Sequence, residues 1–291
     1  MRLREDQLQK EGVFMELLKI VAEKKVLLVA HRGVCGGNIP CNSLQAFQAA
    51  LLAGADVVEL DVERSTDGEL FIQHPGMEKV HLRMNDPIKD FPASVVEQFR
   101  LSNWDHCRTQ YSIPRLEEAL ELLRGKCIIN IDKFWKNPKK IAELVHRLQM
   151  EDQVLIKTDC TPARLEAVEK YASDIPFMAL IREGDVEHEM LMRRNFRYVG
   201  AEVLFDKEDS HLCSKAFVER MHKDSKIVWV NAIVYDYQAV LAGGHNDDIS
   251  ITEDPEQGWG WLADRGFDLI QTDFVFQCRK FLEDTGRRKG E

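Results

Sequence analysis

Short β-rich runs alternate along this chain with longer stretches that have helical spacing of apolar residues, and this alternation most constrains the fold. It is typical of βα units and a parallel sheet. Eight such units predict a TIM (β/α)8 barrel, whose active site lies at the carboxyl ends of the strands. The predicted strands are 26–31, 57–62, 127–132, 154–157, 177–181, 199–205, 227–231 and 268–272, and the predicted helices lie near 43–53, 114–124, 138–149, 161–172, 186–195, 213–223, 256–265 and 275–283.

A ninth β-rich run, residues 69–74, follows the second predicted strand after Asp67-Gly68. Two residues allow only a tight turn, which joins antiparallel strands, whereas parallel strands need a crossover of about a dozen residues or more. We therefore expect a β-hairpin insertion after the second strand.

The length of 291 residues suits one large domain or two small ones. No segment rich in Pro, Gly or Ser divides the chain, so we predict a single barrel domain over residues 25–285. Residues 1–24 mix charged and apolar side chains as an amphipathic helix does, and not as a signal peptide does. We expect this extra N-terminal helix to pack on the barrel, residues 286–291 to form a frayed tail, and the protein to be cytoplasmic.

A formal net charge of -10 argues against general affinity for nucleic acid or anionic membranes, which are bound largely through Lys and Arg. We therefore expect a small-molecule partner and no stable membrane association, and leave the oligomeric state open. The 7 cysteines form no CxxC pairs, which favours reduced structural thiols.

Glu59 and Asp61 lie two residues apart in a predicted strand, so their side chains share one face. Neighbouring carboxylates repel each other unless a proton or a cation lies between them. Oxygen ligands of this kind suit Mg²⁺ or Ca²⁺, and Asp132 at the end of the next strand is the candidate third ligand. The alternative is that the carboxylates form ion pairs with Lys or Arg inside the barrel.

His31 and His74 also lie at strand ends, and imidazole can accept a proton in one step and return it in another. Arg32 can donate two hydrogen bonds to phosphate oxygens, and Gly33 allows a close turn. A structural role for each histidine, and an ion pair between Arg32 and the strand carboxylates, are the alternatives.

The chain resembles the glycerophosphodiester phosphodiesterase family of phospholipase C-like TIM barrels. The resemblance rests on His31-Arg32-Gly33, Asn42-Ser43-Leu44-Gln45-Ala46-Phe47, residues 54–62, Asp67-Gly68 and His74, with weaker matches at 113–120, 228–231 and 271–273. It implies an acid/base pair of His31 and His74 and a divalent cation, Mg²⁺ or Ca²⁺, bound by Glu59, Asp61 and Asp132. It further implies that Arg32 contacts phosphate and that Trp229, on the same strand face as Asn231, lines the substrate pocket.

The sequence departs from the family pattern at several positions. Cys41 replaces a Glu, Pro75 replaces an Asp, and Asp132 and Phe134 replace the family's Glu and Lys. Lys133 is out of phase with the strand. Either the strand ends before Lys133 and frees it, or Lys157 supplies the positive charge; we favour Lys157.

The resemblance implies a metal-dependent phosphodiesterase that converts glycerophosphodiesters to glycerol 3-phosphate and an alcohol. The attacking group is either the neighbouring glycerol hydroxyl, which forms a cyclic phosphate, or water. The alternatives are a phospholipase acting on intact phospholipids and a non-catalytic barrel that binds phosphate esters. Asp247 and Asp248 are interpreted as a solvated loop or a helix-capping element, with a second cation site as the alternative.

Overall fold

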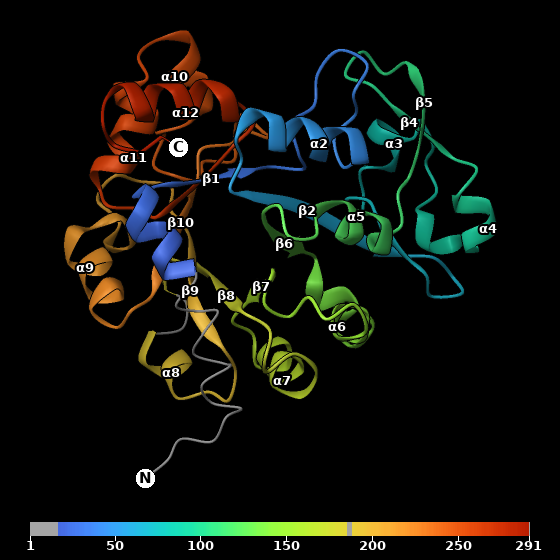
Figure 1. Cartoon of the computed structure of the whole chain (residues 1–291), viewed down its shortest axis with the longest axis horizontal. Helices are drawn as coiled ribbons and strands as arrows, with labels where there is room; N and C mark the ends of the chain where they lie inside the picture. The colour runs from blue at the N-terminus through green and yellow to red at the C-terminus, as the bar shows by residue number, and fades with distance from the viewer. Residues whose placement is uncertain (1–16, 185–187, 291) are drawn as a thin grey trace.

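The computed structural model describes residues 17–184 and 188–290, and its centre is a closed barrel of parallel strands (Figure 1). The barrel order is β1-β2-β6-β7-β8-β9-β10-β11, and the β1–β11 pairing completes the ring. The strands are β1 (Leu27–Ala30), β2 (Val57–Arg64), β6 (Ile128–Asp132), β7 (Val154–Asp159), β8 (Phe177–Arg182), β9 (Tyr198–Leu204), β10 (Ile227–Asn231) and β11 (Leu269–Thr272). The predicted eight-stranded TIM barrel is confirmed.

Helices cover the outside of the barrel, and one apolar core fills the space between strands and helices. In α5 (Leu116–Leu123), for example, Leu116, Leu120 and Leu123 recur at helical spacing and are fully buried. The other helices that follow barrel strands include α2 (Leu44–Ala53), α6 (Pro138–Arg147), α7 (Pro162–Tyr171), α8 (His188–Met192), α9 (Lys215–Lys223), α10 (Asp247–Thr252), α11 (Trp261–Asp264) and α12 (Val275–Asp284). The helix predicted near 256–265 is a π-helical turn, Glu256–Gly260, that continues into α11.

A hairpin insertion follows β2, because β3 (Leu70–Ile72) pairs antiparallel with it as the Asp67-Gly68 turn predicts. A second hairpin, β4 (Arg100–Ser102) with β5 (Arg108–Ser112), lies in the same insertion with α3 (Glu78–His81) and α4 (Ala93–Val96) (Figure 1). The sequence did not predict this hairpin, because both strands are short and mostly polar. The insertion has its own small apolar core, which includes Phe71, Ile88 and Leu101.

The inside of the barrel is apolar at the amino ends of the strands. Leu27, Val57, Trp229 and other inward side chains form a separate cluster there. Residues 17–24 are helical, and Leu17 packs into this cluster. Of the N-terminal helix predicted over 1–24, residues 1–16 lie outside the described residues. Because the inside of the barrel is apolar at the amino ends of the strands, its polar side chains are concentrated toward the carboxyl ends.

The C-terminal segment differs from the predicted frayed tail. The side chain of Arg288 is buried, and its guanidinium forms an ion pair with the buried Asp56 at 2.7 Å and donates to the carbonyl of Val26. Lys24 pairs with the same carboxylate at 2.9 Å. A buried charge is retained only where it has partners, so this network anchors the chain end beside β1.

Arg288→Ala should destabilise the protein by about 3 kcal/mol, because it removes one partner of a buried ion pair. Arg287→Ala is the control: Arg287 pairs with Asp264 and Glu256 at the surface, where such pairs contribute about 1 kcal/mol or less. Urea unfolding of both variants measures the difference, and equal losses would contradict burial of Arg288.

Candidate active site

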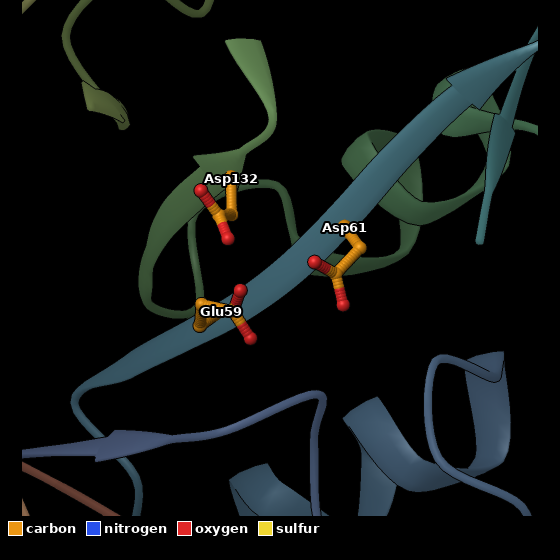
Figure 2. Close-up of side chains that lie close together, drawn as sticks. All are labelled: Glu59, Asp61 and Asp132. Carbon is orange, nitrogen blue, oxygen red and sulfur yellow. The ribbon is translucent and has the colours of Figure 1, made fainter. Parts of the chain in front are cut away.

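Three carboxylates from two neighbouring strands point toward one another at the carboxyl end of the barrel (Figure 2). Glu59 and Asp61 alternate inward on β2, and the parallel register places Asp132 of β6 beside Asp61. One ligand oxygen from each lies within 4.8 Å of the others, and all three residues are buried. We name Glu59, Asp61 and Asp132 the acidic triad.

Hydrogen bonds from the loop after β1 satisfy part of this triad. The backbone N–H of Arg32 donates to Glu59 Oε2 at 2.9 Å, and Asn42 Nδ2 donates to Asp61 Oδ2 at 2.9 Å. The Arg32 guanidinium lies 3.0 Å from the same oxygen of Asp61. Asp61 Oδ1, in contrast, is buried without a hydrogen-bond partner. Because an unpartnered buried carboxylate oxygen is costly, the donor set fits a hard divalent cation.

The backbone conformation of this loop directs its polar groups at the triad. Arg32 and Asn42 both adopt left-handed conformations, with φ of 56° and 54°. Gly33 follows with φ of 79°, and a Cβ there would lie 2.7 Å from the Ala46 backbone at the start of α2. Only glycine fits this approach, which explains its position in the His31-Arg32-Gly33 motif.

The three carboxyl groups of the acidic triad differ in pKa. Burial raises the pKa of Glu59 to about 7, and the negative charge of Asp61 adds to the effect. Burial also acts to raise the pKa of Asp61, but attraction to Arg32, to His74 in its protonated form and to Lys133 prevails and lowers it. The pKa of Asp132 is lowered in the same way, burial being outweighed by Lys157 and Lys133. Without a cation, the repulsion among the three carboxylates therefore mainly disfavours the ionised form of Glu59.

Both predicted histidines border the triad. His31 directly follows β1, and its Nδ1 lies 2.9 Å from Asp273 Oδ1, just after β11. Because a carboxylate only accepts, Nδ1 carries the hydrogen and Nε2 is left for other partners. His74 follows β3, and its Nε2 lies 3.9 Å from Asp61 Oδ1. Burial lowers the pKa of His74, so its ring is neutral near pH 7.

The two candidate lysines lie in different surroundings. β6 ends at Asp132, and Lys133 adopts a left-handed φ of 60°, so the strand does end before Lys133 and frees its side chain. Its ammonium lies 2.5 Å from Asp132 Oδ2 and 3.7 Å from Asp61 Oδ1. Lys157, which we favoured from the sequence, is instead fully buried in a 2.9 Å ion pair with Glu202. The geometry therefore places the ammonium of Lys133, and not that of Lys157, in contact with the carboxylates of Asp132 and Asp61.

Trp229 and Asn231 belong to the network around Lys157. Asn231 Nδ2 donates to Glu202 Oε1 at 2.7 Å, and Trp229 Nε1 donates to Asn231 Oδ1 at 2.9 Å. The Lys157 ammonium lies 4.9 Å from the Trp229 ring centroid. These contacts place both residues in a buried polar network inside the barrel, and their role in lining the substrate pocket stays a prediction. Sequence reasoning missed Glu202, although a single carboxylate in the apolar run 199–205 was the available signal.

Asp273 and a thiol–imidazole pair were also missed. Cys41 Sγ lies 3.5 Å from His81 Nε2 beside the loop that carries Asn42. Burial raises the pKa of Cys41 to about 12 and lowers that of His81 to about 4, so both are neutral near pH 7. Where the family pattern has a carboxylate, this chain therefore places a neutral pair near Arg32. The sequence showed the substitution at Cys41 but not its partner, which comes from the insertion.

The family model described as "Glycerophosphoryl diester phosphodiesterase family" matches residues 31–275. A glycerophosphodiester phosphodiesterase of Bacillus altitudinis is 34% identical over 140 residues, which cover 45% of this chain and 57% of that relative. A solved glycerophosphoryl diester phosphodiesterase of Parabacteroides distasonis has a TM-score of 0.75 at 20% identity, covering 94% of this chain and 92% of that one.

A solved phosphodiesterase of Oleispira antarctica, in complex with the product sn-glycerol-3-phosphate, has a TM-score of 0.64 at 16% identity. That alignment covers 88% of this chain and 96% of the other. At these identities the structural likeness concerns the fold. Within the described residues, no helix is both long and apolar enough to span a bilayer.

Divalent cations should stabilise the protein more at about pH 8 than at about pH 5. The folded-state pKa of Glu59, about 7, exceeds its ordinary value of 4.5, so ionisation of Glu59 destabilises the metal-free folded state as pH rises through this range. A bound cation favours the ionised form and reverses the loss. Thermal melting with chelator, Mg²⁺ or Ca²⁺ at both pH values measures the effect.

Glu59→Gln is the control for this effect, because the amide cannot ionise. It should reduce the pH-dependent part of the metal-induced rise in Tm. Burial also raises the pKa of Asp247 to about 7, but Asp247 lies outside the triad, so its contribution should persist whether or not metal is present. An unchanged metal response in Glu59→Gln would contradict the assignment of Glu59 as a ligand.

Proposed function

The chain belongs to the glycerophosphoryl diester phosphodiesterase family, and from this premise we propose that it hydrolyses glycerophosphodiesters to glycerol 3-phosphate and an alcohol. The main support is the acidic triad bordered by two histidines and two cationic side chains at the mouth of the barrel. The Bacillus altitudinis relative, part of which aligns with this chain, is a glycerophosphodiester phosphodiesterase, which favours the same chemistry. The complex of the Oleispira antarctica phosphodiesterase with sn-glycerol-3-phosphate favours it as well.

Glu59, Asp61 and Asp132 are the proposed ligands of a divalent cation, Mg²⁺ or Ca²⁺. When bound, the cation would offset negative charge on the phosphate and lower the pKa of an adjacent hydroxyl group or water. The unpartnered Oδ1 of Asp61 is the observation that favours this assignment.

Arg32 and Lys133 are the proposed donors to the phosphate oxygens. Both lie at the open edge of the triad and are held there by its carboxylates: burial opposes their charged forms, but Asp61 and its neighbours raise the pKa of each. They therefore remain positive while the phosphate gains charge in the transition state. The ring of Trp135 lies 5.3 Å from the Lys133 ammonium, within the range of a cation–π interaction.

His74 and His31 divide the proton transfers. The neutral ring of His74 suits the general base that removes the proton from the attacking hydroxyl group. His31, protonated on both ring nitrogens and with its Nδ1–H held by Asp273, donates the Nε2 proton to the oxygen of the departing alcohol and is left neutral with its hydrogen on Nδ1. One P–O bond forms and the P–O bond to the alcohol breaks. If the glycerol hydroxyl attacks, water opens the resulting cyclic phosphate in a second step.

The proposal is tested by turnover of soluble glycerophosphodiesters with different alcohol groups, with and without chelator. We expect release of the alcohol and glycerol 3-phosphate that requires a divalent cation. Phosphorus NMR during turnover distinguishes a cyclic phosphate from direct attack by water. A preference for phospholipid micelles would instead support the phospholipase alternative, and binding without release would support the non-catalytic barrel.

His31→Ala and His74→Ala should each lower kcat on the order of 10² to 10⁴-fold, the usual contribution of a general acid or base. His106→Ala, at an exposed position of the insertion, is the matched control and should retain wild-type turnover. Turnover near that of the wild type in both active-site variants would refute the acid/base assignment.

Lys133→Met and Lys157→Met should have different effects. Lys133→Met should lower kcat/KM about 10²-fold with little change in Tm, because it removes a partly exposed phosphate donor. Lys157→Met leaves Glu202 buried without its cation and should cost about 3–5 kcal/mol of folding stability, measured by urea unfolding. If Lys157→Met instead weakened substrate binding at unchanged stability, the sequence-based choice of Lys157 would be supported.

A further inference from the structure

Asp247, at the start of α10, is a buried carboxylate that accepts three hydrogen bonds. Its Oδ1 accepts from Trp259 Nε1 and Thr272 Oγ1, each at 2.7 Å, and its Oδ2 accepts from the backbone N–H of Asp273 at 2.8 Å. Its side chain is almost completely inaccessible to solvent. Of the two sequence-based interpretations, the solvated loop is therefore wrong for Asp247, which is buried in the first turn of α10, whereas Asp248 in the same turn is exposed.

These three donors are neutral groups. Burial raises the pKa of Asp247 to about 7, and the hydrogen bonds lower it only in part. A buried carboxylate held by neutral donors stabilises a fold less than a neutral side chain with the same contacts would. Asparagine has nearly the same shape as aspartate but only one acceptor oxygen. An acid at this position therefore indicates that both side-chain oxygens are needed as hydrogen-bond acceptors.

The second oxygen is the one that contacts the end of β11. Asp247 Oδ2 accepts from the N–H of Asp273, and the carboxylate of Asp273 accepts from His31 Nδ1 at 2.9 Å. The Asp247 backbone N–H is also bound, at 2.7 Å, to the carbonyl of Ala232 just after β10. Asp247 is thus held at two strand ends, by its backbone at β10 and by its carboxylate at β11, and Asp273 connects it to the proposed catalytic histidine, His31.

We propose that Asp247 is a positioning residue that holds Asp273 in place and, through Asp273, fixes the tautomer of His31. The inference rests on the proposed function only for the role of His31 in proton transfer. The hydrogen-bond chain itself does not depend on the substrate. Thr272 reinforces it, because its hydroxyl donates to Asp247 and accepts from the N–H of Phe274 at 2.9 Å.

Asp247→Asn tests the link to Asp273 selectively. The amide oxygen can still accept from Trp259 and Thr272, but the NH₂ group then faces the N–H of Asp273, and two donors repel. At about pH 8, where Asp247 is ionised in the wild type, we expect kcat to fall about 10 to 100-fold with little change in KM.

A double-mutant cycle with Asp273→Asn separates positioning from a general structural effect. If Asp247 acts through Asp273, Asp247→Asn should have little further effect on kcat in the Asp273→Asn background. Two control variants should leave kcat near wild type: Asp248→Asn at the exposed neighbour, and Trp259→Phe, which removes one donor to Asp247 but keeps the bond to Asp273. Multiplicative effects in the cycle would overturn the proposal.

The tautomer of His31 gives a readout that needs no activity. In ¹⁵N-histidine NMR spectra, with His31 assigned by His31→Gln, the neutral ring should carry its hydrogen on Nδ1 in the wild type and in Trp259→Phe. This preference should be lost in Asp247→Asn. An unchanged tautomer in folded Asp247→Asn would overturn the proposal even in a protein active on its substrate.

The same spectra keep this inference separate from the proposed function. A wild-type protein that turns over no phosphodiester but shows the expected tautomer shift in Asp247→Asn would refute the function and retain the positioning role. If thermal melting shows that Asp247→Asn is unfolded at the assay temperature, Asp247→Glu replaces it. That variant keeps two acceptor oxygens but displaces them by one methylene, and the same loss of the His31 tautomer is expected.

Discussion

The mutual repulsion of three buried carboxylates determines how the mouth of this barrel is built. Glu59 and Asp61 both point into the barrel because alternate side chains of β2 share a face, and the parallel register with β6 places Asp132 beside Asp61. Two fixed positive charges, Arg32 and Lys133, offset the repulsion in part. The oxygen of Asp61 that remains without a hydrogen-bond partner is the feature that fits the proposed divalent cation.

The side chains that surround the triad are placed by loop backbone more than by strands. Arg32, Asn42 and Lys133 all adopt left-handed conformations, which non-glycine residues seldom adopt. Such conformations are retained when local contacts compensate them, and here the compensating contacts are hydrogen bonds and ion pairs with the triad. The same electrostatic attraction thus positions the groups that would contact the substrate.

Two buried polar networks outside the acidic triad support the site. Inside the barrel, Lys157, Glu202, Asn231 and Trp229 form a connected polar network below the triad. At the rim, Asp247 connects the ends of β10 and β11 to Asp273 and His31. Buried polar networks of this kind stabilise a unique arrangement only when nearly every member has a partner, which makes each of these residues sensitive to substitution.

The sequence by itself determined the barrel, the first hairpin, the acidic triad and the two histidines as candidates, because these depend on local periodicity, strand ends and turn length. Tertiary structure decided which lysine faces the triad, since the end of β6 and the left-handed turn at Lys133 have no periodic signal. It also decided the pairing of Cys41 with His81, of Arg288 with Asp56 and of Asp247 with Asp273. These partners are separated by 40, 232 and 26 residues in the sequence, so no local pattern links them, and only the tertiary packing of loops and strand ends brings them together.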